Sequence, residues 1–437
     1  MPEALQRSLM TRVLLVLPTA TYRAADFLSA ASALGVEVVL ASDQPQAMSE
    51  AMGGRALHVD LDRPEATASA IVELASRLPL DAVVGVDDQG VLPAALAAER
   101  LGLPHNPPAA AALTRDKAAM RAALARAGVA QPAYAVLEQG HDAAAKARGL
   151  GFPVVVKPTG LAASQGVIRA DDPATAAQAE ARVRAILGAE GRPSAEPLLL
   201  ERYVPGEEVA VEGLLSGGAL SVLAVFDKPD PLEGPYFEET IYVTPSRHPP
   251  EVTEAVAHVT ASACAALGLS EGPVHAELRL PPDQMSPGQT APGQTGVPAP
   301  GAVLLEVAAR SIGGLCSRTL SFGTGLSLER VILAHALGLP PTDLTPTTEA
   351  AGVMMLPIPA SGVLRAIKGQ EEARAVQGIV GLELSIALGR TVQALPEGNR
   401  YLGFLLARGP TPAEVEGSLR AAHARLEVVV EPLAPAR

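Results

Sequence analysis

Short apolar runs alternate with amphipathic stretches along the first hundred residues. Strands are predicted at residues 12–17, 37–41 and 81–86, and helices at residues 22–34, 64–78 and 93–101. Strands separated by helices indicate a parallel sheet that is covered on both faces. No G-x-G-x-x-G sequence follows the first strand, so the fingerprint of a dinucleotide-binding fold is missing. We therefore predict an N-terminal α/β domain over residues 1–110.

The pattern changes after residue 110. Helices are predicted at residues 114–127, with Thr114 as the cap, and at 172–187, 251–267 and 326–337. Strands fill most of residues 153–228 and recur at 274–280 and 302–310. Residues 281–301 are rich in proline and glycine, so we expect a flexible hairpin extension there. These elements predict a central domain over residues 111–340 and a strand-rich C-terminal α+β domain over residues 341–437.

Composition narrows the class of protein. Hydrophobic residues make up 48% of the 437 residues, which is typical of globular proteins with more than one domain. A net charge of −13 argues against nucleic-acid binding, and the sequence has no run of about 20 apolar residues that would predict a membrane span. The apolar run at residues 13–17 is too short for a secretory signal and is interpreted as the first strand. Two cysteines in so long a chain are typical of a reducing compartment, so we expect a cytoplasmic location.

Strand parity brings two glutamates together. Side chains two residues apart in a strand point to the same face, so His275, Glu277 and Arg279 share one face of their predicted strand. Glu306 and Arg310 likewise share a face of the next strand. If the two strands pair, Glu277 and Glu306 converge, and adjacent carboxylates repel unless a cation such as Mg²⁺ lies between them. The alternative is that both glutamates lie on the solvent-exposed face of a sheet.

A candidate phosphate site precedes these strands. Lys157 ends an apolar strand and is followed by a loop of small residues that contains Gly160, Ser164 and Gly166. Small residues let backbone N–H groups approach an anion, and a lysine beside them adds a positive charge. The sequence has no Walker A motif, and the loop alone does not distinguish a phosphate site from an ordinary glycine hairpin.

Glu201 and Glu208 flank a proline–glycine turn. One interpretation has residues 201–204 meeting the edge of an adenine, with Glu208 accepting hydrogen bonds from ribose hydroxyls. The other interpretation is a pair of surface glutamates on either side of a β-turn.

The order of these residues resembles the ATP-grasp superfamily. The resemblance covers residues of about 110–340 and rests on Lys117, on Lys157 with its glycine-rich loop, on Glu201-x6-Glu208, on Glu277 and on Glu306-x3-Arg310. It implies an ATP-grasp fold in which residues of about 130–205 form a mobile lid. The N- and C-terminal modules resemble those that flank the grasp in carboxylases and ligases of this superfamily.

The resemblance also implies how the nucleotide is bound. Lys117 and Lys157 would contact the phosphates of ATP, with residues 160–166 as a mobile phosphate loop. Glu201 and Val204 would frame the adenine, and Glu208 would bind the ribose.

The same resemblance implies the metal and catalytic residues. Glu277 and Glu306 would hold magnesium, with manganese as an alternative. Lys157, Lys228 and Arg310 would offset the charge of the nucleotide and of an acyl-phosphate. Many ATP-grasp enzymes have Glu-x-Asn where this chain has Glu306-Val307-Ala308, and alanine cannot bind a metal ion. Either one metal ion has fewer protein ligands, or catalysis is impaired.

Two stretches resemble the L-amino-acid ligase and carnosine-synthase branch, namely residues 226–246 and the sequence EVAARSIGG at 306–314. That branch implies a ligase that joins a carboxylate to an amine, often two amino acids, while ATP is converted to ADP and phosphate. The candidate substrate residues are Tyr236, Glu239, Arg247, Gly313 and Gly314. Packing of an ordinary aromatic pair remains an alternative for Tyr236, and a simple turn remains one for the two glycines.

His275 is a candidate acceptor of the proton that the attacking ammonium must lose, or else a half-buried structural histidine.

Two other functions stay open. One is a biotin-carboxylase-like or purine-biosynthetic enzyme that activates bicarbonate or formate. The other is a nucleotide-binding protein that has lost turnover, motivated by Ala308. We expect small-molecule substrates and no nucleic-acid or membrane partner. We also expect a homodimer, which is common among carboxylase-like members of the superfamily.

Overall fold

The computed structural model describes residues 11–45, 53–282, 301–323, 325–340 and 343–433. Most of the predicted hairpin extension at residues 281–301 therefore lies outside the described residues. Among the described residues, no helix is both long and apolar enough to cross a membrane.

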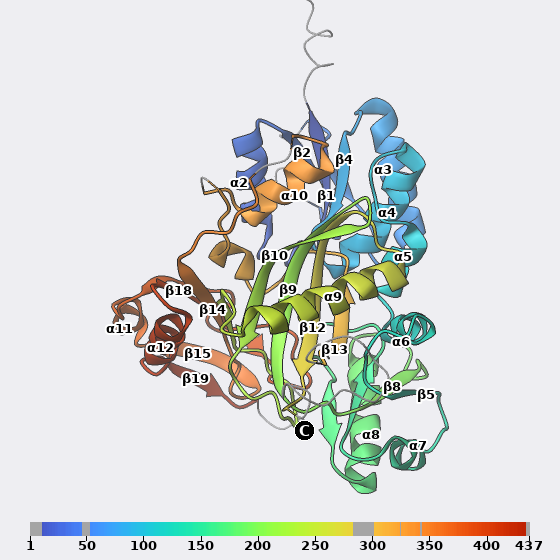
Figure 1. The fold of residues 1–437 in the computed structure, drawn as a ribbon, viewed down its shortest axis with the longest axis vertical. Coiled ribbons are helices and arrows are strands. Elements are labelled where there is room, and N and C mark those ends of the chain that lie inside the picture. The colour runs from blue at the N-terminus through green and yellow to red at the C-terminus, as the bar shows by residue number, and fades with distance from the viewer. Residues whose placement is uncertain (1–10, 46–52, 283–300, 324, 341–342, 434–437) are drawn as a thin grey trace, which may run out of the picture.

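The N-terminal part is a parallel sheet of four strands in the order β3-β2-β1-β4, as predicted. The strands are β1 (Arg12–Val16), β2 (Glu37–Ser42), β3 (Ala56–His58) and β4 (Ala82–Gly85). The accompanying helices are α2 (Ala24–Leu34), α3 (Pro64–Arg77) and α4 (Asp88–Leu101). Figure 1 shows that α10 (Leu328–Ala336), from much later in the chain, packs beside α2.

Helix α4 begins at Asp88 rather than at the predicted residue 93, and Pro93 lies inside the helix. A glycine pair explains how the first turn fits there. A side chain at Gly85 would lie 2.6 Å from the carbonyl oxygen of Gly90, and one at Gly90 would lie 2.4 Å from that of Val16. This close approach places the start of α4, with two aspartates, directly at the carboxyl end of the sheet.

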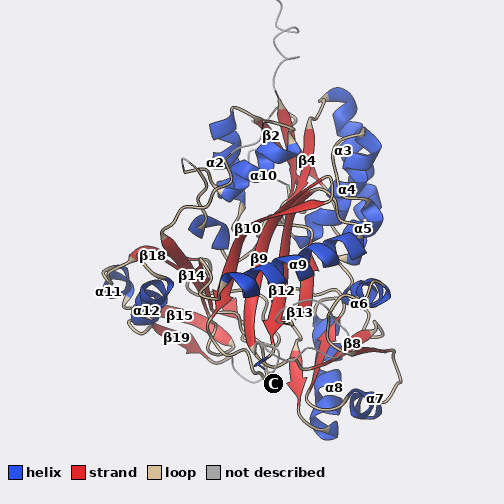
Figure 2. Cartoon of the chain, in the orientation of Figure 1, coloured by secondary structure: helices blue, strands red, loops and turns tan. Residues whose placement is uncertain are grey.

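The central sheet has eight antiparallel strands in the order β13-β12-β9-β10-β11-β14-β18-β16. They are β9 (Glu207–Ser216), β10 (Ala219–Lys228), β11 (Ile241–Thr244), β12 (Gly272–Leu280), β13 (Val303–Ala308), β14 (Ala350–Leu356), β16 (Ile379–Leu384) and β18 (Gly403–Gly409). Helix α9 (Pro250–Leu267) lies across one face of this sheet (Figure 2). Strands from both sides of the predicted domain boundary at residue 340 share the sheet, so the hydrogen-bonded layer is continuous across it.

A smaller antiparallel sheet, β5-β8-β6-β7, covers one end of the central sheet (Figure 1). Its elements are β5 (Tyr134–Leu137), β6 (Val154–Pro158), β7 (Ile168–Ala170) and β8 (Leu198–Arg202), with helices α7 (Ala143–Leu150) and α8 (Pro173–Ala189). We call residues 134–202 the cover. Arg182 of the cover forms two hydrogen bonds with Glu397, of 2.7 and 3.0 Å, and so ties the cover to a loop of the C-terminal part.

The remaining elements connect these layers. They are α5 (Pro108–Leu113), α6 (Lys117–Arg126), the short 3-10 helix η3 (Cys316–Thr319), α11 (Gln370–Arg374), α12 (Pro412–His423) and the three-stranded sheet of β15 (Gly362–Lys368), β17 (Thr391–Val392) and β19 (Glu427–Glu431). Asp116, and not the predicted Thr114, caps α6, because its carboxylate accepts hydrogen bonds from the N–H groups of Ala118 and Ala119. Thr114 instead ends α5.

Candidate active site

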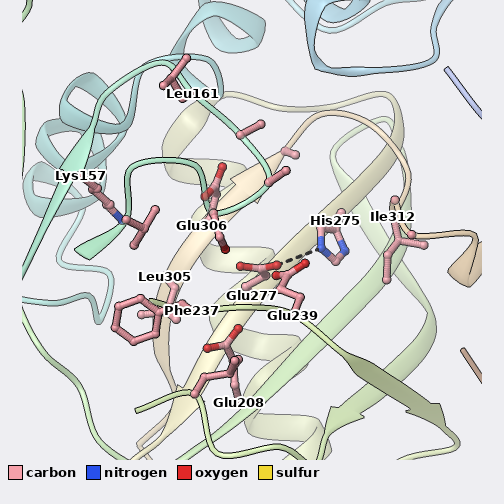
Figure 3. Close-up of a pocket in the computed structure, with 18 of the residues that line it drawn as sticks. Lys157, Leu161, Glu208, Phe237, Glu239, His275, Glu277, Leu305, Glu306 and Ile312 are labelled. Atoms are coloured by element: carbon pink, nitrogen blue, oxygen red, sulfur yellow. Dashed lines mark ion pairs between the residues drawn. The ribbon is translucent and has the colours of Figure 1, made fainter. Parts of the chain in front are cut away.

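A cavity of about 270 Å³ lies where the cover, the central sheet and the carboxyl end of the N-terminal sheet meet. Figure 3 shows side chains from these parts of the chain projecting into it. Most of the predicted site residues line this cavity: Lys117, Lys157, Ser164, Glu201, Val204, Glu208, Glu239, His275, Glu277, Glu306, Arg310, Gly313 and Gly314.

The cavity has apolar walls beneath the cover. Val155 of β6, Val204 and Leu305 face Tyr203 and Phe237, whose rings stack with their centres 6.2 Å apart. Flat apolar surfaces of this kind suit an aromatic base.

Glu201 is a buried carboxylate that binds two cationic side chains at the end of the cavity beneath the cover. Its carboxylate lies 2.6 Å from Nε of Arg121 on α6 and 2.8 Å from Nζ of Lys157 on β6. Burial alone would raise the pKa of Glu201, but the charges of Arg121 and Lys157 lower it to about 2. The carboxylate is thus already bound within the protein, and the role of Glu201 and Val204 in framing an adenine stays a prediction for this segment of the cavity lining.

Lys117 and Lys157 both reach the loop side of the cavity. Nζ of Lys117 lies 3.1 Å from Glu306 and donates a 2.8 Å hydrogen bond to the carbonyl of Leu161. In that loop Ala163 and Ser164 both have positive φ, which costs non-glycine residues about 1–2 kcal/mol each. The two lysines therefore present positive charge beside a strained turn.

Three carboxylates cluster on the central sheet. Oxygens of Glu208, Glu239 and Glu277 lie within 4.8 Å of one another and form a candidate metal site (Figure 3). Nζ of Lys228 contacts Glu208 and lies 2.9 Å from Glu239 and 3.6 Å from Glu277. Burial raises the pKa of Glu239, whereas the Lys228 charge and the His275 hydrogen bond outweigh burial and lower the pKa of Glu277 to about 2.

Glu277 and Glu306 face each other across the β12–β13 pair, as strand parity predicted. Both line the cavity, and the same pairing places His275 opposite Ala308. The pKa of Glu306 is lowered, because the charges of Lys117 and Lys157 outweigh the effect of burial.

His275 lies between two of the carboxylates near the cavity. Its Nε2 lies 3.6 Å from Glu277, and its Nδ1 lies 3.7 Å from Glu212 of β9. Although burial favours the neutral ring, its two carboxylate partners raise the pKa of His275 to about 9. In Figure 3 the ring lies between Glu277 and Ile312.

Arg310 is anchored by the N-terminal part of the chain. Its Nη2 lies 3.0 Å from Asp88, the first residue of α4, and Asp88 also pairs with Arg115 at 3.0 Å. Burial opposes the charged form, yet the nearby Asp88 carboxylate raises the pKa of Arg310 above its usual range. Beside it, the N–H of Gly314 donates a 2.6 Å hydrogen bond to the hydroxyl of Tyr22.

Five predicted residues do not line this cavity, although the structure describes them all: Gly160, Gly166, Lys228, Tyr236 and Arg247. Gly160 packs on the guanidinium of Arg192, and the N–H of Gly166 donates to the carbonyl of Pro396. Lys228 contacts the site through its carboxylate partners, and its Nζ lies 5.0 Å from the ring centre of the lining residue Tyr242.

The last two of these residues bind other side chains. The hydroxyl of Tyr236 accepts a hydrogen bond from Arg182, and Arg247 pairs with Asp227 at 3.0 Å and Glu416 at 2.8 Å. A spacing along the chain does not reveal these long-range partners.

Several residues of the site escaped the sequence reasoning. Asp88 and Tyr22 line the cavity, whereas Arg121 and Glu212 lie behind its wall and pair with the lining residues Glu201 and His275. Arg121 lies in an alanine-rich helix and looks like a surface residue. Asp88 follows a predicted strand directly, and polar residues at the carboxyl end of a parallel strand were a usable signal.

Comparison with known proteins identifies the class. Residues 28–105 match the ATP-grasp N-terminal domain, residues 150–296 match the ATP-grasp domain, and residues 354–431 match the L-amino acid ligase C-terminal domain 2. The D-alanine–D-alanine ligase of Citrifermentans bemidjiense is 33% identical over 225 residues, which cover 49% of this chain and 68% of that protein. The chain belongs to the ATP-grasp superfamily.

Two further relatives are a ligase and a synthase by name. Alanine–anticapsin ligase of Bacillus subtilis is 31% identical over 240 residues, and carnosine synthase 1 of Gallus gallus is 31% identical over 338 residues. The first match covers 51% of this chain and 50% of the relative, and the second covers 72% and 34%. The chain therefore spans about half the length, or less, of these two relatives.

The fold agrees with this class. The structure of L-amino acid ligase from Bacillus licheniformis superposes with a TM-score of 0.77 and 24% identity, covering 96% of this chain and 99% of that one. This likeness confirms the predicted ATP-grasp fold. The fold implies the use of ATP and a divalent metal ion.

Proposed function

We propose that this protein is an ATP-dependent carboxylate–amine ligase that forms an amide, such as a dipeptide, through an acyl-phosphate and releases ADP and phosphate. One observation carries the proposal. A single cavity combines an apolar slot, two lysines, a cluster of carboxylates and the anchored Arg310. The named relatives, which join amino acids or amino-acid-like substrates, support the amide product.

The residues present fit ATP with a divalent cation. The stacked pair of Tyr203 and Phe237 suits an adenine, and Lys117 and Lys157 suit the phosphates. Carboxylate oxygens are the ligands that Mg²⁺ prefers, and Glu277 lies both in the three-carboxylate cluster and opposite Glu306. A bound Mg²⁺ would neutralise charge on the phosphate oxygens.

The protein's own residues would position the substrates. Arg310, held by Asp88, would bind the carboxylate substrate while it takes up the phosphoryl group. The amine then attacks the acyl carbon and phosphate leaves. Nε2 of His275 would take the proton that the ammonium releases when the ring is neutral, which its pKa of about 9 makes the main form only at alkaline pH. Glu239 lies where it could hold the ammonium group.

We further propose amino acids as the substrates. We also propose the cytoplasm as the location, because both buried cysteines are free thiols. A homodimer remains a prediction.

An ADP-release screen over pairs of amino acids, with mass spectrometry of the products, tests the function. We expect ADP release that requires two amino acids and yields their amide. Release that depends on bicarbonate or formate would favour a carboxylase-like enzyme. ATP binding without any ADP formation over a broad panel would favour a protein that has lost turnover.

A further inference from the structure

Glu212 is a buried carboxylate for which the proposed reaction has no direct use. It lies in the middle of β9, and its side chain is 0% exposed to solvent. The sequence pattern does not single it out, because it stands alone within the apolar part of the strand that follows Glu207 and Glu208. Burying a carboxylate in this way costs several kcal/mol unless its partners compensate for it.

The partners of Glu212 come from two different segments of the site. One oxygen accepts a 2.9 Å hydrogen bond from the N–H of Ile312, and it lies 3.7 Å from Nδ1 of His275. Its other oxygen, and Nδ1 of His275, have no hydrogen-bond partner among the described residues. Glu212 thus touches the backbone that follows β13 and the imidazole of β12, but it does not line the cavity.

Both segments carry candidate site groups. Ile312 and Gly313 line the cavity and lie two and three residues after Arg310. His275 lines it as well and faces Glu277 through Nε2. A shift of either segment would move a group that contacts substrate in the proposed reaction.

We propose that Glu212 is a positioning residue. From its place in β9 of the central sheet, it holds the Arg310–Gly314 segment and the His275 ring in a fixed position relative to each other. Its contact with Ile312 fixes the backbone that carries the binding groups for the carboxylate substrate. Its charge lies 3.7 Å from Nδ1 of His275, so that the neutral ring keeps its N–H on that nitrogen and presents a bare Nε2 toward Glu277 and the cavity. This inference rests on the proposed function for the kinetic effects, but its structural claims do not.

Glu212→Gln separates the two contacts. The amide oxygen can still accept from the N–H of Ile312, whereas the charge beside His275 is lost and an N–H donor can take its place. We expect the KM for the carboxylate substrate to stay within about twofold and kcat to fall about tenfold. Glu212→Leu removes both contacts and should also raise that KM about tenfold.

Glu329→Gln is a matched control. Glu329 of α10 is also buried and has an oxygen without a hydrogen-bond partner among the described residues, but it does not line the cavity. We expect kcat and KM to be unchanged in this variant. ADP affinity should be unchanged in all three variants, because Glu212 does not contact the apolar slot beneath the cover.

Two readouts do not need turnover. Amide hydrogen exchange at Ile312 should keep its rate in Glu212→Gln and rise about tenfold in Glu212→Leu. ¹⁵N NMR of the histidines, recorded above the His275 pKa of about 9 and with His275 assigned from a His275→Gln variant, should show the N–H on Nδ1 in the wild type and a changed tautomer in Glu212→Gln. If Glu212→Gln matches Glu329→Gln in kcat and in the His275 spectrum, the inference is wrong.

If the wild type forms no amide, the proposed function fails, while exchange and NMR still decide the role of Glu212. If Glu212→Leu does not fold, Glu212→Gln alone decides it.

Discussion

The two ends of the cavity hold a buried glutamate in opposite ways. Beneath the cover, Glu201 binds two full positive charges at 2.6 and 2.8 Å, and its pKa is lowered to about 2. On the central sheet, Glu212 has one backbone N–H and a histidine at 3.7 Å, and burial raises its pKa. Glu201 is thus held by strong ion pairs within the protein, whereas Glu212 is held by weaker contacts. The end with spare hydrogen-bonding capacity is the one where we place the amino-acid substrates.

Removing Arg121 should have the largest effect on stability. Its guanidinium is buried, pairs with Glu201 and also donates to the carbonyls of Leu304 and Leu305. Arg121→Leu leaves these groups without their donor, and we expect a loss of about 3–5 kcal/mol in the free energy of unfolding, measured with urea. Arg126→Leu, at an exposed position of the same helix, should change it by less than about 0.5 kcal/mol. Equal effects would contradict the role given to the ion pairs.

Lys157→Ala should lower kcat/KM for ADP formation by about 10²–10³-fold, since a charge aimed at phosphate is lost. Lys146→Ala is the control, because Lys146 also belongs to the cover but donates to the carbonyl of Val136 and does not line the cavity. Activity in Lys157→Ala close to that of Lys146→Ala would show that the phosphates bind elsewhere.

The two glutamates should give opposite pH dependences of stability. The pKa of Glu201 lies below its ordinary 4.5 in the folded protein, so its stabilisation, about 3 kcal/mol, is present above pH 4.5 and is lost as the pH falls toward 2. Glu201→Gln should therefore lose most stability at neutral pH and match the wild type near pH 2. Because the pKa of Glu212 is raised, Glu212→Gln should gain stability relative to the wild type as the pH rises through 4.5. Urea unfolding over pH 3–8 measures both, and shifts of the same sign would contradict the comparison.

The smallest effect concerns the metal. Ala308 lines the cavity two residues after Glu306, so Ala308→Asn would add an oxygen ligand there. We expect Mn²⁺ affinity in the presence of ADP to rise a few-fold by calorimetry, at roughly 1 kcal/mol of binding free energy. Ala308→Val has a similar size without the oxygen and should give no increase. An equal response of both variants would argue against a metal ion beside Glu306.

The sequence predicted those parts of the site that depend on the spacing of residues within one strand or loop. Strand parity, on the condition that the two strands pair, anticipated that Glu277 and Glu306 converge, since the spacing of side chains in a strand does not depend on the rest of the fold. The start of α4 was missed because Pro93 resembles a helix start, whereas the Gly85–Gly90 contact that seats the helix joins two elements. Glu201 and Tyr236 illustrate the limit. Their partners, Arg121 and Arg182, are far from them in the chain, and no local pattern distinguishes a glutamate bound to a distant arginine from one that faces a ligand.

Transfer of ¹⁸O from the carboxylate substrate tests the central claim most directly. With an amino acid labelled in both carboxylate oxygens, an acyl-phosphate route leaves one label in the amide product and passes one to the released phosphate. Mass spectrometry should therefore find one ¹⁸O per phosphate for each amide formed. Unlabelled phosphate, with both labels retained by the amino acid, would contradict activation of a carboxylate at this site.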